Sequence, residues 1–161
     1  MKNIEWCNDA LVLLDQTKLP TQVEYIHCTD WRQVAEAIKM LRVRGAPAIG
    51  VAAGYGLILA ANEANRLEAP FSEQISAFYE WSEELKETRP TAINLAWAVN
   101  RVMAIVKAGQ FDAMNEVVDR ITKEAIAIHN EDVELNTRMA INGATLFEGK
   151  KHLRILTHCN A

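Results

Sequence analysis

The chain has 161 residues, half of them apolar, and its 21 acidic and 17 basic residues give a formal net charge of -4. This is about the length of one domain, with enough apolar residues for a real core. Because nucleic acids and anionic membrane surfaces bind basic patches, the acidic balance argues against both as partners.

Three cysteines, Cys7, Cys28 and Cys159, lack the short spacings of a metal site. The first ten residues lack the apolar run of a signal peptide, and an odd number of cysteines then indicates free thiols in a reducing compartment. The sequence also has no P-loop, GxGxxG or zinc pattern. We therefore expect a cytoplasmic protein that uses neither a cofactor nor a metal.

The N-terminal residues predict a small antiparallel sheet. Residues 4–7 and 10–16 are short apolar runs on either side of Asn8-Asp9, a pair typical of a hairpin turn. Residues 23–29 form a third candidate strand, because they are rich in aromatic and β-branched residues.

Helical spacing of apolar residues follows the sheet. Three helices are predicted from this spacing, over residues 31–42, 73–88 and 92–109. Thr29 or Asp30 is the expected cap of the first, Ser72 opens the second, and Pro90 stands at the start of the third. The third helix is apolar nearly all round as far as Asn100, so we expect it to be buried.

An uncharged run over residues 45–62 lies between the first two of these helices, with Pro47 in its first turn and Gly50 and Gly54 in GxxxG spacing. One interpretation is a buried helix whose small residues let neighbours come close. The other is a membrane span, for which the run is marginal against the roughly 20 apolar residues required.

A last helical segment begins at Met114 and repeats apolar residues at helical spacing as far as Ile128. It either continues beyond that point or restarts with Asn130 as its cap, and Gly143 is its predicted stop. A polar turn then leads to a final strand that begins at Leu153.

The sequence RGAPAIG places Arg44 in a break directly before a helix start. Unpaired N–H groups there favour an anion, Gly45 permits close approach to the backbone, and Arg44 offers a forked contact to a phosphate. An ordinary turn with a surface arginine is the alternative.

TRPTAIN repeats the arrangement, with Arg89 before Pro90 and Thr91 in the opening turn. Two such breaks predict a shared anion site, provided that the arginines meet in space.

The final strand delivers Thr157, His158, Cys159 and Asn160. Ligands of open α/β sheets gather beyond the carboxyl ends of strands, so Cys159 is a candidate catalytic residue. The alternative is that this cysteine is a small buried hydrophobe. Neighbouring side chains of an extended chain point to opposite faces, which argues against a nucleophilic pair of Cys159 with His158.

Five stretches, LVLLDQTKLP, VRGAPAIGVAAGYG, TRPTAINLAWAVNR, NEDVELN and ILTHCNA, together resemble the methylthioribose-1-phosphate isomerases of methionine salvage. This family is related to the regulatory subunits of eukaryotic initiation factor 2B. The resemblance covers the whole chain. It implies an intramolecular oxidoreductase that converts 5-methylthioribose 1-phosphate, an aldose phosphate, to the ketose 5-methylthioribulose 1-phosphate.

The resemblance also implies two parts, a mostly helical N-terminal domain and a larger Rossmann-like domain. We expect an α+β, mainly α fold over residues 1–150, in which a small antiparallel β element precedes a helical domain. Residues 151–161 are then the first strand of a Rossmann-like domain whose remainder is missing. The full-length protein is expected to be a homodimer.

By the resemblance, Arg44, Gly45 and Ala46 match a substrate-binding RGA, Arg89 matches a second substrate arginine, and Cys159 matches the catalytic cysteine. In the family a proton-donating aspartate and a substrate-binding Asn-Lys pair lie further along the chain. We therefore expect an N-terminal fragment of an enzyme whose substrate is a small sugar phosphate, inactive by itself.

Three alternatives compete with this interpretation. The first is a non-enzymatic regulatory subunit of the initiation factor 2B type, which would sense a sugar phosphate or nucleotide and bind a protein partner. The second is a related ribose-1,5-bisphosphate isomerase. The third is a stable helical domain whose last strand has lost its sheet and carries an unpaired edge.

Overall fold

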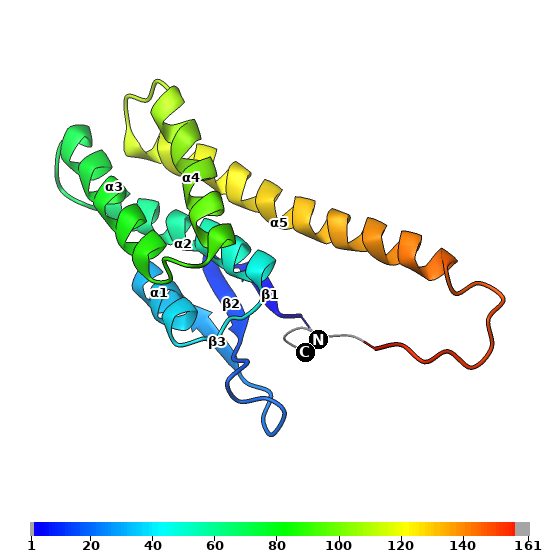
Figure 1. Ribbon diagram of the computed structural model, residues 1–161. Coiled ribbons are helices and arrows are strands. Elements are labelled where there is room, and N and C mark those ends of the chain that lie inside the picture. The colour runs from blue at the N-terminus through cyan, green and yellow to red at the C-terminus, as the bar shows by residue number, and fades with distance from the viewer. Residues whose placement is uncertain (1, 157–161) are drawn as a thin grey trace.

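The computed structural model describes residues 2–156 and places a helical body on a small sheet (Figure 1). The strands are β1 (Ile4–Cys7), β2 (Ala10–Leu14) and β3 (Tyr25–Cys28). The helices are α1 (Trp31–Lys39), α2 (Ala46–Asn65), α3 (Phe71–Glu87), α4 (Ile93–Ala108) and α5 (Met114–Thr145). This order confirms the predicted α+β, mainly α fold with its N-terminal antiparallel β element.

The sheet has the order β1-β2-β3, and both strand pairs are antiparallel. Asn8 and Asp9 connect β1 to β2 with φ of 50° and 56°. Two successive positive φ values give the two-residue turn whose twist matches that of a hairpin. Strand β2 lies in the middle, and its Leu11 and Leu13 are fully buried against the helices.

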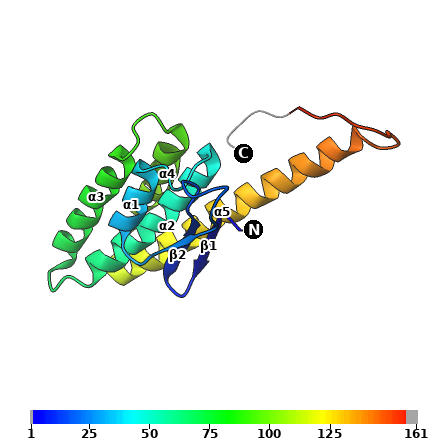
Figure 2. The ribbon, with the colours of Figure 1, turned by 90° about the horizontal axis from the view of Figure 1, so that it is seen from below.

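Helix α2 forms the centre of the body, with the other helices around it (Figures 1 and 2). Every residue from Ile49 to Ala61 is buried. A helix that is apolar on all sides has to be surrounded, which explains the uncharged run in the sequence. Among the described residues, no helix is long and apolar enough to cross a membrane, so the interpretation as a buried helix is confirmed.

Helix α1 begins at a capping box and ends earlier than predicted. The Asp30 carboxylate accepts a hydrogen bond from the Arg32 N–H, and the Gln33 side chain accepts one from the Asp30 N–H in return. The helix ends at Lys39 instead of residue 42, because Leu41 takes a left-handed conformation with φ of 60°. Such a residue is a common way to close a helix.

The start of α4 corrects one prediction. Pro90 and Thr91 lie in a turn before the helix, since the Ala92 N–H donates to the Arg89 carbonyl over 2.9 Å and α4 begins only at Ile93. Proline fits the second position of such a turn as well as the first turn of a helix. Helix α3 likewise begins at Phe71, one residue before the predicted Ser72.

The predicted burial of α4 is only partly right. One face is buried against the core, through Leu95, Val99 and Val102 among others. The opposite face is open at its start, where Ile93 is 81% exposed and Trp97 49% exposed. Ile93 and Trp97 line an open pocket together with residues of α2 and α5, and among the described residues nothing covers them.

Helix α5 continues without a break to Thr145, so Asn130 is an interior residue and Gly143 is not the stop. Its second half projects beyond the other helices in both views (Figures 1 and 2). Residues 153–156, predicted to begin a strand, form none in the part of the chain that the structure describes. The rest of that predicted strand, including Cys159, lies outside the described residues.

Candidate functional site

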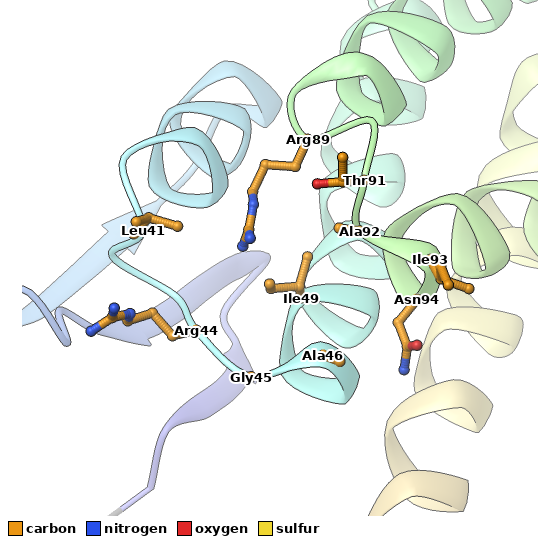
Figure 3. A pocket seen from close by; sticks show the side chains of 10 residues that line it. All are labelled: Leu41, Arg44, Gly45, Ala46, Ile49, Arg89, Thr91, Ala92, Ile93 and Asn94. Atoms are coloured by element: carbon orange, nitrogen blue, oxygen red, sulfur yellow. The ribbon is translucent and has the colours of Figure 1, made fainter. Parts of the chain in front are cut away.

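Two turns that are far apart in the sequence meet at one pocket of about 500 Å³ (Figure 3). One turn leads into α2 and the other into α4. The lining residues are Leu41, Arg44, Gly45, Ala46, Ile49, Arg89, Thr91, Ala92, Ile93 and Asn94. The structure therefore brings the predicted residues Arg44, Gly45, Ala46 and Arg89 to a common place.

Gly45 gives the first turn its shape. It is the N-cap of α2 with φ of 97°, a conformation that a residue with a side chain rarely adopts. Because glycine has no side chain to cap the helix, and Pro47 follows directly after Ala46, the first turn has no side-chain hydrogen bond at its N-terminus. The positive end of the α2 dipole is thus open to an anion.

The second turn has the same property. Ala92 is the N-cap of α4, and it too provides no side-chain cap. Its own N–H is used within the turn by the bond to the Arg89 carbonyl, which fixes Arg89 next to the helix start. Two helix N-termini without side-chain caps therefore border the same pocket, each preceded by an arginine.

The first turn is held in place by an ion pair between the buried Asp15 and the partly exposed Arg42. The Arg42 guanidinium donates to the Asp15 Oδ2 over 2.6 Å and to the Glu36 Oε2 over 3.0 Å. Thr17 adds a hydroxyl hydrogen bond of 2.6 Å to the Asp15 Oδ1. Burial by itself raises the pKa of Asp15, but the bonds from Thr17 and Arg42 outweigh it and leave that pKa below its ordinary value. A charged carboxylate thus anchors the loop.

Arg44 and Arg89 differ from Arg42 because neither guanidinium has an ion pair or hydrogen bond with the described residues. Figure 3 shows Arg89 reaching into the space between the loop after α1 and the start of α2. Arg44 lies on the other side of that loop and its guanidinium points away from Arg89. The structure places both arginines at one pocket without directing them at one point.

Sequence reasoning singled out five of the ten lining residues and missed the other five, among them Asn94 and Leu41. Asn94 lies in the first turn of α4, and it is the only polar residue from Ala92 to Val99, which was the available signal. Leu41 borders the pocket from the end of α1, and nothing in its local sequence indicates this position. Cys159, the predicted catalytic residue, lies outside the described residues.

Comparison with known protein families identifies the class to which the chain belongs. The profile of the Initiation factor 2 subunit family matches residues 42–161, so the chain belongs to this family. This confirms the resemblance drawn from the sequence motifs.

Methylthioribose-1-phosphate isomerases are the named relatives of the chain. The enzyme of Desulforamulus reducens is 46% identical over 162 residues, which cover 100% of this chain and 45% of the relative. The enzyme of Pelotomaculum thermopropionicum is also 46% identical, over 164 residues and 43% of its length. The chain thus spans less than half the length of these curated relatives.

Two solved structures resemble the fold closely. The 5-methylthioribose 1-phosphate isomerase of Pyrococcus horikoshii matches 89% of this chain and 40% of its own, with a TM-score of 0.83 and 41% identity. The delta subunit of translation initiation factor eIF-2B from A. fulgidus matches 83% of this chain and 38% of its own. Its TM-score is 0.74 at 40% identity.

Proposed function

We propose that the chain is the N-terminal portion of a methylthioribose-1-phosphate isomerase, and that the pocket between α2 and α4 holds the phosphate of its substrate. One observation carries the proposal: the same pocket is bordered by two helix N-termini without side-chain caps and by two arginines whose guanidinium groups have no partner within residues 2–156. Such an arrangement suits a phosphate, which accepts hydrogen bonds on several oxygens and favours positive charge. The names of the relatives support 5-methylthioribose 1-phosphate as the substrate.

The chemistry explains why a firm hold on the phosphate helps. The phosphate ester at C1 prevents the sugar ring from opening as a free aldose does. The ring oxygen has to gain a proton as its bond to C1 breaks. A hydrogen then passes from C2 to C1, as a hydride or through an enolate, and the C2 hydroxyl loses its proton as it becomes a ketone, so one proton is gained and one is lost. The phosphate does not change, so the groups that bind it act by positioning the reacting carbons.

Arg44, Gly45 and Ala46 would bind the phosphate from the α2 side and Arg89 from the α4 side. Cys159 would act on the reacting carbons, where a polar group placed against developing charge lowers the barrier. The proton donor is assigned to the part of a full-length isomerase that lies beyond this chain. The chain alone should therefore bind sugar phosphate without converting it. The full-length protein is proposed to be a cytoplasmic homodimer.

A regulatory role is the second candidate, favoured by the close match to the eIF-2B delta subunit. In that case the same pocket would sense a sugar phosphate or a nucleotide, and the signal would pass to a protein partner. The two candidates share the pocket and differ in whether bound sugar phosphate is converted.

A chimera tests the proposal. The segment of the Desulforamulus reducens isomerase that matches this chain, 45% of its length, is replaced by residues 1–161. We expect the chimera to convert 5-methylthioribose 1-phosphate, with ketose formation followed directly. A folded chimera that binds the substrate without converting it would favour the regulatory candidate.

Arginine variants of the chimera locate the phosphate. Because a hydrogen bond to a charged group contributes about 1.5–3 kcal/mol, Arg44→Ala and Arg89→Ala should each raise KM by about tenfold or more. The matched control is Arg66→Ala, which removes an arginine from the opposite end of α2 and should leave KM unchanged. Equal KM values for all three variants would contradict the pocket assignment.

A further inference from the structure

Gly50 occupies a position on α2 where no other residue fits the present structure. It is buried, and it faces the first turn of α4. A Cβ built on Gly50 would lie 2.9 Å from the carbonyl oxygen of Asn94 and 3.5 Å from its carbonyl carbon. Because the obstacle is backbone, it has no side-chain rotation by which to move aside.

We propose that Gly50 is a positioning residue of the anion pocket: the absence of a side chain there sets the distance between the starts of α2 and α4. This role rests on the proposed function, because it concerns the same phosphate site. Gly50 lies about one helical turn after Ala46, and Asn94 follows two residues after Ala92. The contact therefore lies directly beneath the two turns that carry Arg44 and Arg89.

An added side chain at position 50 would displace the start of α4 more easily than it would displace α2. Helix α2 is enclosed from Ile49 to Ala61, whereas the start of α4 has an open outer face at Ile93 and Trp97. An added methyl group at position 50 would therefore push the start of α4 outward. The turn before α4 would move with it, because the Arg89 carbonyl is bonded to the Ala92 N–H.

A second glycine of the same helix provides a matched control. A Cβ at Gly54, one turn further along α2, would lie 3.5 Å from the Ala125 Cβ and 3.6 Å from its Cα. These are ordinary van der Waals distances, so α5 need not move. Gly50→Ala and Gly54→Ala thus add the same methyl group to the same buried helix, but only the first meets a backbone atom of α4.

The test uses the 161-residue chain labelled with ¹⁵N and titrated with inorganic phosphate. The amide signals of Gly45, Ala46 and Ala92 report binding, and thermal melting reports stability. We expect Gly50→Ala to raise the phosphate Kd about tenfold, since small errors of position are costly in a preorganised site. It should also shift the amide signals of residues 89–94 before phosphate is added. Gly54→Ala should leave both the Kd and those signals unchanged.

Other results would contradict either the positioning role of Gly50 alone or the anion site as a whole. A Gly50→Ala chain that binds phosphate like the wild type, or that weakens binding no more than Gly54→Ala does, overturns the positioning role alone. A Gly50→Ala chain that does not fold overturns it as well, because the contact would then serve the whole core. No phosphate binding by the wild type, or binding indifferent to Arg44→Ala and Arg89→Ala, overturns the proposed anion site and the positioning role together.

Discussion

The two halves of α5 form one continuous helix, yet the first half is packed in the core and the second half is exposed. The first half buries Met114, Val117, Ile121, Ala125 and Ile128 in the core. The second half carries apolar side chains that are half or more exposed, namely Val133, Leu135, Met139 and Ile141. The second half also contains a pair at helical spacing, because Leu135 and Met139 stand four residues apart. The comparison teaches that periodicity shows which side chains could be buried together, and that only the surrounding fold decides whether they are.

The boundary between the halves is marked by two polar links. The Arg101 guanidinium of α4 donates to both oxygens of Glu131 over 2.6 and 2.8 Å. Two residues earlier, the Tyr55 hydroxyl of α2 lies 2.8 Å from the His129 Nδ1, and Trp6 of β1 stacks on the Tyr55 ring. Beyond Glu131 the helix has lost these ties to the body.

The largest expected effect compares two isoleucines of this helix. Ile121 is fully buried and Ile141 is 61% exposed. Ile121→Ala should lower the free energy of unfolding by about 2–5 kcal/mol, because it leaves a cavity in the core. Ile141→Ala should change it by no more than about 0.5 kcal/mol. Urea denaturation of both variants measures the difference, and equal losses would show that the second half is packed in solution.

A smaller effect is expected at the boundary itself. Arg101→Ala removes the bonds to Glu131 and a 2.6 Å bond to the Glu124 Oε1, and should cost about 1–2 kcal/mol in urea denaturation. Arg120→Ala is the control, since Arg120 makes only a longer, exposed contact of 3.5 Å to Glu124. Amide exchange after residue 131 should accelerate in the first variant only. Equal exchange rates in the two variants would contradict a boundary set by Arg101.

The same contact makes a prediction about pH. The hydrogen bond from Arg101 lowers the pKa of Glu131 below its ordinary value of 4.5. The folded-state pKa is then below the unfolded one, so this stabilisation is complete above about pH 4.5 and is lost as the pH falls through the folded pKa. Melting curves of the wild type should show this loss, and those of Arg101→Ala should not.

The smallest effect concerns His129. Burial lowers its pKa below the ordinary 6.5, although the charge of Asp132 acts in the opposite direction. Since folding favours the neutral ring, the stabilisation is complete above about pH 6.5 and declines as the pH falls through that value towards the folded pKa. His129→Gln should remove this decline from the melting temperature. A variant with the same pH dependence as the wild type would show that another group is responsible.

Turns and helix caps could be predicted from the sequence where the residue types favour a single backbone conformation. Asn8 and Asp9 tolerate left-handed backbone, so the hairpin turn follows from the sequence. Asp30 and Gln33 form a capping box, so the start of α1 follows too. The sequence predicts Pro90 at the helix start, whereas the structure has it in a turn, because proline suits both positions equally and its sequence neighbours do not separate the two.

The candidate site was predictable in part for the same reason. The repeated arrangement of an arginine before a proline-containing break identified Arg44 and Arg89. That both line one pocket depends on how α4 packs on α2. The GxxxG spacing of Gly50 and Gly54 indicates that a neighbour comes close, but it does not show that the neighbour of Gly50 is the Asn94 backbone. Asn94 was missed because a single amide in an apolar helix has no distinctive spacing.

The loop before α2 holds Arg42 by ion pairs and leaves the Arg44 guanidinium without one among the described residues, and this difference affects the entropy lost when an anion binds. Arg42 is tied to Asp15 and Glu36, and its backbone is bonded to the end of α1, while the Arg44 guanidinium has no partner among the described residues. Ordering a loop on binding costs about 1–2 kcal/mol for each residue whose backbone is fixed. In this loop the backbone is fixed before any ligand arrives. An anion therefore has to restrict only the rotamers of Arg44 and Arg89, and more of its contact energy remains as affinity.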